Sequence, residues 1–370
     1  MRIECPNCRR VCAISSDLIV TQKRALELSC SICKADFHVQ LSLPVEIKPQ
    51  EARRTPSGDS SARLVSPIAE TDDNPKITSL KSKILRGLVE LPPMPNIILK
   101  AREIMEDSGS SLKDLAGVIE HDQAIVARVL ALANSAYYGL SGLVSSIQHA
   151  SILLGQKTLG ELITIAASSK LLNKKLKGYR LHPGDLWKHS LAVALGSRMI
   201  AEIRNAEWVE DAFIAGLLHD AGKIILNPYI VEREKAFKKA LGNGQPRFID
   251  AEKEILGFDH AEVMSRAIRF WRYPENQSTA IRYHHCPSRS EDSELAYIVH
   301  LADAAAKKAG FKSENGVPQS EIDPQTLRYL GFQKEDLSPI IDETAVSGEK
   351  LADEFKYSAV CVLRGVRATG

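Results

Sequence analysis

Apolar residues recur at steps of three and four along most of this chain, and this period constrains the fold more than any other feature. Between 115 and 132 the recurring positions are Leu115, Val118, Ile119, Ile125, Val126, Val129, Leu130 and Leu132. The same spacing returns in 150–172, 185–203, 209–226 and 293–310. A three-to-four step places apolar side chains on one face of a helix. No β-hairpin signal interrupts the series after Ile77, so the chain from there on is predicted to be all-α.

The composition is that of an ordinary globular protein. Apolar residues make up 44% and charged residues 25% of the 370 residues, with a net charge of +2. This balance requires neither a nucleic acid nor a membrane as partner. No apolar run approaches the roughly 18 residues of a membrane span, and the first residues lack the apolar core of a signal peptide. We therefore expect a cytoplasmic protein that contacts no membrane.

Changes in composition divide the chain into four predicted parts. Residues 1–42 hold five of the seven cysteines, and residues 43–76 are rich in Pro, Ser and charge, as in a disordered linker. The helical pattern of residues 77–310 predicts one domain, with an N-terminal helical half at 77–175 and a second half at 176–310. Residues 311–370 are predicted to be a C-terminal helical extension.

Two CxxC pairs near the N-terminus predict a metal site. Their cysteines are Cys5, Cys8, Cys30 and Cys33, with 21 residues between the pairs. Four thiolates at nearly this spacing are typical of a closed, tetrahedral structural zinc site. The intervening segment and residues 37–41 suit short strands, so the module resembles a small β-rich zinc ribbon. A ribbon of this kind can bind nucleic acid, bind protein, or only fold; nucleic-acid binding has no other support here beyond a mild positive charge.

A second candidate site lies in the segment "GLLHDAGKIIL" at 216–226, where a His-Asp pair separates two apolar runs. Buried titratable side chains need a partner. Further candidates stand beside apolar or aromatic residues downstream and upstream of the pair. The set comprises His189, His219, Asp220, His260, His284, His285 and Asp303, with Asp185 as a possible extra ligand.

Imidazole and carboxylate ligands together suit transition metals such as Fe, Mn, Zn or Ni. Seven ligands exceed the need of one ion, and an aspartate could bridge two ions, a pair that can generate a hydroxide nucleophile and clamp a phosphoryl group. Lys223 shares a helix face with Asp220 and could neutralise phosphate charge.

Other histidines caution against interpreting every His as a ligand, because a single His on an apolar helix face is usually a hydrogen-bonded core residue. His121-Asp122 is a second HD pair without matching partners, and we interpret it as an exposed helix start. His149 and His182 are predicted to lie at the surface. His300 stands one turn before Asp303 and could support a ligand.

Several motifs together resemble a known family. They are Leu91–Pro95, Ala133–Gly139, Val144–Ile147 leading to Leu153–Gly155, Trp187–Ser190 and Phe213–Asp220. In this order, over about residues 80–310, they resemble the HDOD domain of bacterial signalling proteins, a branch of the HD superfamily of metal-dependent phosphohydrolases. Tyr137 and Tyr138 in the second motif are predicted to be packing residues.

The resemblance implies two alternative functions. HDOD domains are known mainly as regulatory or scaffolding modules, so the chain is expected to act as a signalling output that binds another signalling protein. The complete ligand set implies instead a phosphodiesterase or phosphomonoesterase acting on a nucleotide or other phosphate ester. By analogy with two-metal HD enzymes, one ion would bind His189, His219, Asp220 and Asp303. The second would bind Asp220, His260, His284 and His285, with Asp220 and Lys223 as catalytic candidates.

One departure limits the analogy. After His285 the sequence runs Cys286-Pro287-Ser288-Arg289, and lacks the Glu and the Gly-Tyr-Pro motif of relatives that cleave cyclic di-GMP. The sequence therefore gives no support for that substrate.

Overall fold

A computed structural model divides the chain into two compact units. The helical unit comprises Asp73–Lys356, and the terminal unit joins Met1–Asp72 to Tyr357–Gly370. The structure describes residues 2–4, 11–14, 25–29, 36–40, 75–89, 96–106, 109–119, 122–135, 137–140, 144–204, 206–242, 247–313, 322–358 and 361–365.

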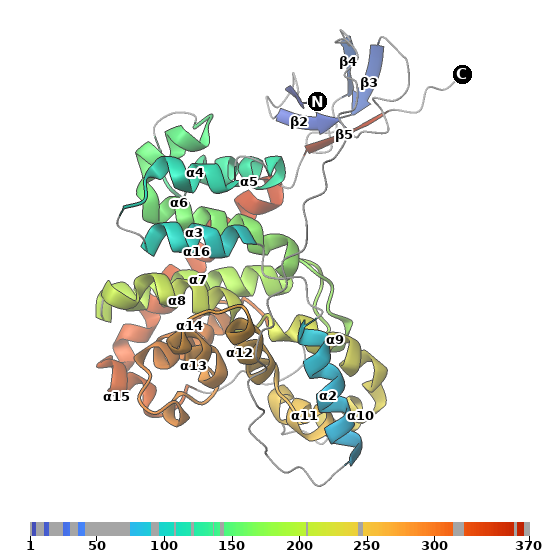
Figure 1. The fold of residues 1–370 in the computed structure, drawn as a ribbon, viewed down its shortest axis with the longest axis vertical. Helices are drawn as coiled ribbons and strands as arrows, with labels where there is room; N and C mark the ends of the chain where they lie inside the picture. The colour runs from blue at the N-terminus through green and yellow to red at the C-terminus, as the bar shows by residue number, and fades with distance from the viewer. Residues whose placement is uncertain are drawn as a thin grey trace, which may run out of the picture. The chain divides into compact units, whose positions relative to one another are not determined.

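The first half of the helical unit packs three short helices against one long helix (Figure 1). Helices α3 (Asn96–Glu106), α4 (Leu112–Ile119) and α5 (Gln123–Ala133) all contact α6 (Ile147–Leu172). Helix α5 begins where the Asp122 side chain accepts hydrogen bonds from the backbone N–H groups of Ala124 and Ile125. Gly155 interrupts the helical geometry of α6 with φ of 78°, a conformation that glycine adopts at little cost.

Asn134 fixes the loop that leads from α5 to α6. Its side chain donates to the carbonyls of Leu130 and Val144 and accepts from the Val144 N–H. Tyr137 and Tyr138 pack edge-to-face beside it and contact the hydrophobic core, which confirms their predicted packing role. The Tyr137 hydroxyl also accepts a hydrogen bond from Arg198. The motif therefore joins the first half to the helix that carries Arg198.

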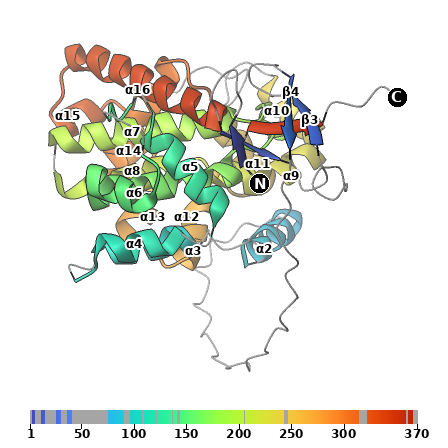
Figure 2. The ribbon, with the colours of Figure 1, turned by 90° about the horizontal axis from the view of Figure 1, so that it is seen from above.

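The second half is built around two largely buried helices, α7 (Asp185–Arg204) and α8 (Val209–Leu218). Helix α7 packs on α8 and α14 (Glu294–Lys308), and α13 (Glu275–Tyr283) contacts α8, α14 and α12 (His260–Phe270). The close approach of α7 and α8 depends on Gly216, because a Cβ there would lie 2.9 Å from the Val193 carbonyl oxygen. Figure 2 shows α16 (Leu337–Ser358) along α7, where Thr344 lies against Gly196.

The remaining helices complete the helical unit. They are α2 (Pro75–Val89), α9 (Gly222–Glu232), α10 (Glu234–Leu241), α11 (Phe248–Leu256) and α15 (Thr326–Leu330), with the 3₁₀ turns η1 (Lys177–Tyr179), η2 (Ala206–Trp208), η3 (Pro287–Arg289) and η4 (Lys334–Asp336). Helix α2 packs against α9, α11 and α12. The prediction of a mainly helical fold is confirmed, and none of the described helices combines the length and apolar character needed to span a membrane.

The terminal unit contains a five-stranded sheet whose order is β1-β2-β5-β3-β4. Its strands are β1 (Arg2–Glu4), β2 (Val11–Ile14), β3 (Ala25–Ser29), β4 (Asp36–Gln40) and β5 (Cys361–Gly365). Strand β5 pairs parallel with β2 and antiparallel with β3. The segment predicted as a helical extension does contain α15, η4 and α16, but Cys361–Gly365 forms the central strand of the sheet. A short apolar run of this kind is ambiguous between helix and strand until its pairing partners are known.

The four cysteines of the predicted zinc site lie outside the described residues, as does the linker up to Asn74.

Candidate metal centre

The candidate ligands come from five helices or their ends. His189 lies within α7, His260 begins α12, and Asp303 lies within α14. The two adjacent pairs, His219-Asp220 and His284-His285, stand just after the last residues of α8 and α13. Both members of each pair contribute a ligand atom to the same centre from these helix ends.

The first half-site joins residues of α7, α8 and α14. The Nε2 atom of His189 lies 3.2 Å from His219 Nε2, 3.2 Å from Asp303 Oδ1 and 3.5 Å from Asp220 Oδ2. His219 Nε2 lies 3.5 Å from the same Asp220 oxygen. These four side chains are all buried. They are the four residues expected for a first ion.

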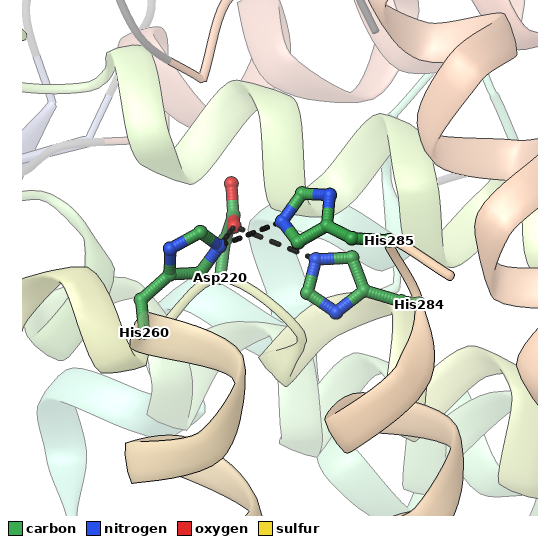
Figure 3. A group of neighbouring side chains, drawn as sticks. All are labelled: Asp220, His260, His284 and His285. Carbon is green, nitrogen blue, oxygen red and sulfur yellow. Dashed lines mark hydrogen bonds and ion pairs between the residues drawn. The ribbon is translucent and has the colours of Figure 1, made fainter. Parts of the chain in front are cut away.

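The second half-site lies on the other side of the Asp220 carboxylate. Figure 3 shows His260, His284 and His285 directed toward Asp220 from α12 and from the end of α13. His260 Nε2 lies 3.1 Å and His284 Nε2 4.0 Å from Asp220 Oδ1, and His285 Nε2 lies 2.9 Å from His260 Nε2. His285 is only partly buried, whereas the other three are fully buried. Asp220 thus offers one oxygen to each half-site.

The imidazoles are held so that their Nε2 atoms face the carboxylates. The Nδ1 atoms of His189, His219 and His284 lie 3.0, 2.7 and 2.7 Å from the backbone carbonyls of Phe311, Gly216 and Ile281, respectively. A carbonyl only accepts, so Nδ1 carries a proton, and in the neutral form of such a ring the lone pair is on Nε2. Each of these rings therefore presents a metal-binding atom to the centre.

Several buried atoms at the centre have no hydrogen-bond partner among the described residues. They are Asp220 Oδ1, His284 Nε2 and Asp303 Oδ1. All three are electron-pair donors, and such atoms are costly to bury unless something satisfies them. Imidazole nitrogens and carboxylate oxygens are suitable ligands for Fe, Mn or Zn. The donor set therefore fits one or two divalent transition-metal ions.

Two lysines accompany the carboxylates. Lys223 Nζ lies 2.8 Å from Asp220 Oδ2 and donates to the Ser313 carbonyl at 3.1 Å, and Lys307 Nζ lies 2.7 Å from Asp303 Oδ2. Burial disfavours ionisation of both aspartates, but the lysines and neighbouring histidines hold the pKa of each carboxyl well below its usual range. Both carboxylates are therefore ionised in the folded protein. Lys223 is an ion-pair partner of Asp220 in this arrangement.

Glycine at 222 permits the assembly. A Cβ on Gly222, at the start of α9, would lie 2.0 Å from the backbone oxygen of His260. Asp220 precedes this contact by two residues, so the close approach of α9 to α12 brings Asp220 within reach of His260.

Two residues of the centre carry no motif and were missed by the sequence analysis. Glu252 of α11 accepts from the Nδ1 of His260 at 2.7 Å, and Tyr179 of η1 donates to Glu252 at 2.5 Å. Burial opposes protonation of His260, but the carboxylates of Glu252 and Asp220 together outweigh it and raise the pKa of His260 to about 10. In the sequence, Glu252 is one charged residue of an amphipathic helix and stands eight residues before His260. This position was the only sequence feature that could have pointed to its role.

The other candidates fall outside the centre. Asp185 accepts a hydrogen bond from the His182 N–H and is not among the ligand groups that the described residues bring together. His149 and His182 are exposed, as predicted. His121 lies outside the described residues, although Asp122 does begin a helix.

His300 supports a ligand through the backbone. Its Nδ1 lies 2.7 Å from the His284 carbonyl oxygen, and its Nε2 accepts from the Asp323 N–H. It therefore helps to fix the turn that carries His284 and His285.

Comparisons with known proteins agree with this fold. A model of the HDOD domain family matches residues 91–287, more than half of the chain. An uncharacterized protein of Treponema pallidum is 25% identical over 265 residues, which cover 70% of this chain and 49% of that protein. The chain thus spans about half the length of this relative.

Two solved structures are similar over most of their lengths. An HDOD domain protein of unknown function from Geobacter sulfurreducens has a TM-score of 0.63 and 26% identity, covering 76% of this chain and 98% of that one. A candidate phosphohydrolase from Shewanella amazonensis has a TM-score of 0.58 and 25% identity, covering 74% of this chain and 97% of that one.

Proposed function

Because the chain belongs to the HDOD domain family, we propose that it is a bacterial signalling protein that holds divalent metal at the Asp220 centre and acts by binding another signalling protein. The observation that carries the metal proposal is the convergence of imidazole Nε2 atoms from several helices on a buried carboxylate that faces two groups of histidines. Such an arrangement is unfavourable unless a cation lies among the donors.

The burial of the centre favours regulation over turnover. Of the seven candidate ligands, only His285 is partly exposed. A substrate must reach the atoms that act on it. A metal ion that links α7, α8, α12, α13 and α14 can hold these helices together even when no substrate can reach it. Metal binding would then stabilise one arrangement of these helices by mass action, and a partner could recognise that arrangement.

A second candidate function is a metal-dependent phosphohydrolase. It is favoured by the two oxygens of Asp220, each of which faces its own group of imidazoles. A bound metal pair would supply a hydroxide nucleophile and hold a phosphoryl group. Asp220 would bridge the ions, and Lys223 would hold that carboxylate while neutralising charge nearby. The substrate class would be a nucleotide or another phosphate ester, and the similar protein from Shewanella amazonensis is consistent with this chemistry.

For the N-terminal segment we propose structural zinc bound by Cys5, Cys8, Cys30 and Cys33. The support is the spacing of the two CxxC pairs. Thiolate ligands require a reducing compartment, in keeping with the expected cytoplasmic location. Nucleic-acid binding by this ribbon is the weakest of the alternatives.

One experiment tests the metal proposal and separates the two functions. The full chain, purified anaerobically and equilibrated with Mn²⁺ or Fe²⁺, is compared with His219→Ala by elemental analysis. We expect one or two ions of the added metal in the wild type and a clear loss in the variant. No added metal in the wild type would refute the proposal. The loaded protein is then screened with phosphomonoesters, nucleotides and cyclic dinucleotides, and hydrolysis that His219→Ala abolishes would favour the enzyme.

A further inference from the structure

Glu252 accepts three hydrogen bonds, two from His260 and one from Tyr179. Its Oε2 atom accepts from the backbone N–H of His260 at 2.9 Å and from the Nδ1 of the same residue at 2.7 Å. Its Oε1 accepts from the Tyr179 hydroxyl at 2.5 Å. The Glu252 side chain is fully buried, and so is Tyr179. The position and the ring orientation of His260 are therefore both set by one carboxylate.

This support distinguishes His260 from the other candidate ligands. His189, His219 and His284 rest on neutral backbone carbonyls, whereas His260 rests on a charged side chain. A carboxylate behind an imidazole fixes the ring and increases the basicity of its other nitrogen. Among the ligands with a described Nδ1 partner, His260 is thus the one whose strength as a ligand depends on another side chain.

Tyr179 keeps that carboxylate in place. It ends the turn η1, which an isolated bridge between Leu176 and Leu181 encloses. Its ring packs on Phe248 of α11 with a centroid separation of 4.9 Å. The hydroxyl is thereby directed at Glu252, one turn further along the same helix as Phe248.

We infer that Glu252, held by Tyr179, is the positioning residue of the second half-site, and that it sets the affinity for an ion bound by His260, His284 and His285 without affecting the first half-site. The inference rests on the proposed metal centre. Glu252 is not itself among the candidate ligands, and it contacts the second half-site through Nδ1 of His260, the ring nitrogen on the side away from Asp220. Removal of such a partner typically weakens metal binding about 10–100-fold.

The test uses the full chain titrated with Mn²⁺, whose paired and isolated ions differ in their electron paramagnetic resonance spectra. Three variants separate the contributions: Glu252→Ala, Glu252→Gln, which keeps an oxygen acceptor for His260, and Tyr179→Phe. A matched control is Glu161→Gln, which alters a partly buried carboxylate that pairs with Arg198 at 2.7 Å and lies on α6, a helix that supplies none of the candidate ligands. Thermal unfolding of every metal-free variant establishes that it is folded.

We expect Glu252→Ala to weaken the second ion about 10–100-fold, to replace the paired signal by that of an isolated ion, and to leave the first ion unchanged. Glu252→Gln and Tyr179→Phe should have smaller effects in the same direction. In a His189→Ala background, where the first half-site is already weakened, Glu252→Ala should remove the remaining ion.

Equal weakening of both ions in a folded Glu252→Ala protein would overturn the inference, and so would an unchanged paired signal. Absence of any Mn²⁺ from the wild type would be a different result, since it refutes the metal centre itself.

Discussion

Replacement of Gly222 by alanine tests whether the close contact between α9 and α12 holds the centre together. The added Cβ would lie 2.0 Å from the His260 oxygen, 2.8 Å from its carbonyl carbon and 3.1 Å from its Cα. All three are backbone atoms, so no side-chain rotation can relieve the contact. Real Cβ atoms essentially never approach within 3.0 Å, so the two helix starts must separate by about 1 Å.

The magnitude follows from this displacement. Overpacking a tight interior typically costs about 1–3 kcal/mol, and a rigid backbone clash places Gly222→Ala at the upper end, about 3 kcal/mol. The same separation would lengthen the 3.1 Å contact between Asp220 Oδ1 and His260 Nε2. We therefore expect the variant to be less stable and to lose affinity for metal in the second half-site.

Urea unfolding of the metal-free protein measures the first effect, and Mn²⁺ titration measures the second. Gly117→Ala is the control, because Gly117 lies inside α4 with no atom within 4 Å of an added Cβ. That substitution should be neutral or stabilise the protein by up to about 1 kcal/mol. An unfolding free energy of Gly222→Ala within about 0.5 kcal/mol of the wild type would refute the argument, since that is the range of inconspicuous surface changes.

Three further outcomes are expected. Asp220→Ala should destabilise the metal-free protein by about 3–5 kcal/mol, because it leaves the Lys223 ammonium buried without its carboxylate. Asp220→Ala combined with Lys223→Met should regain stability in urea unfolding. Elemental analysis should show that this double variant does not regain metal binding. Burial of Asp323 opposes its ionisation, but hydrogen bonds from Gln325 and Ser288 lower the pKa of the carboxyl below its ordinary 3.8. Ionised Asp323 therefore stabilises the fold above pH 3.8, and this contribution is lost as the pH falls through the pKa of the folded state. The difference in unfolding free energy between wild type and Asp323→Asn should consequently shrink in acid. Cys30→Ser should remove zinc from the chain and leave Mn²⁺ at the Asp220 centre unchanged; retention of zinc in this variant would contradict the ribbon.

The sequence predicted the helical fold because the apolar period is strong and nearly uninterrupted. It also located the centre, since five histidines next to apolar residues are hard to explain singly. It could not assign the partners of Nδ1, because most of these are backbone carbonyls whose direction depends on where other segments fold. The Phe311 carbonyl beside His189 is an example.

Glu252 and Asp185 both show that sequence spacing does not identify the contacts of a side chain. The first was overlooked, and the second was wrongly included as a possible ligand. Glu252 looked like an ordinary charged residue of a short helix, yet packing buries it completely beside His260. Asp185 shares a helical face with His189 by spacing, yet the start of α7 uses its carboxylate to bind the His182 N–H. Spacing along one helix cannot reveal which neighbours the other helices provide.

The central position of β5 determines the order in which the chain can fold during synthesis. This strand follows β4 by more than 300 residues. During translation of the helical unit, β2 and β3 are therefore already synthesised but cannot yet pair with β5. Domains generally fold as their residues emerge, and the helical unit is complete in sequence before β5 appears. Until then the facing edges of β2 and β3 lack their partner, and unpaired edges invite association with other chains. Proteolytic removal of β5 would leave the facing edges of β2 and β3 unpaired again.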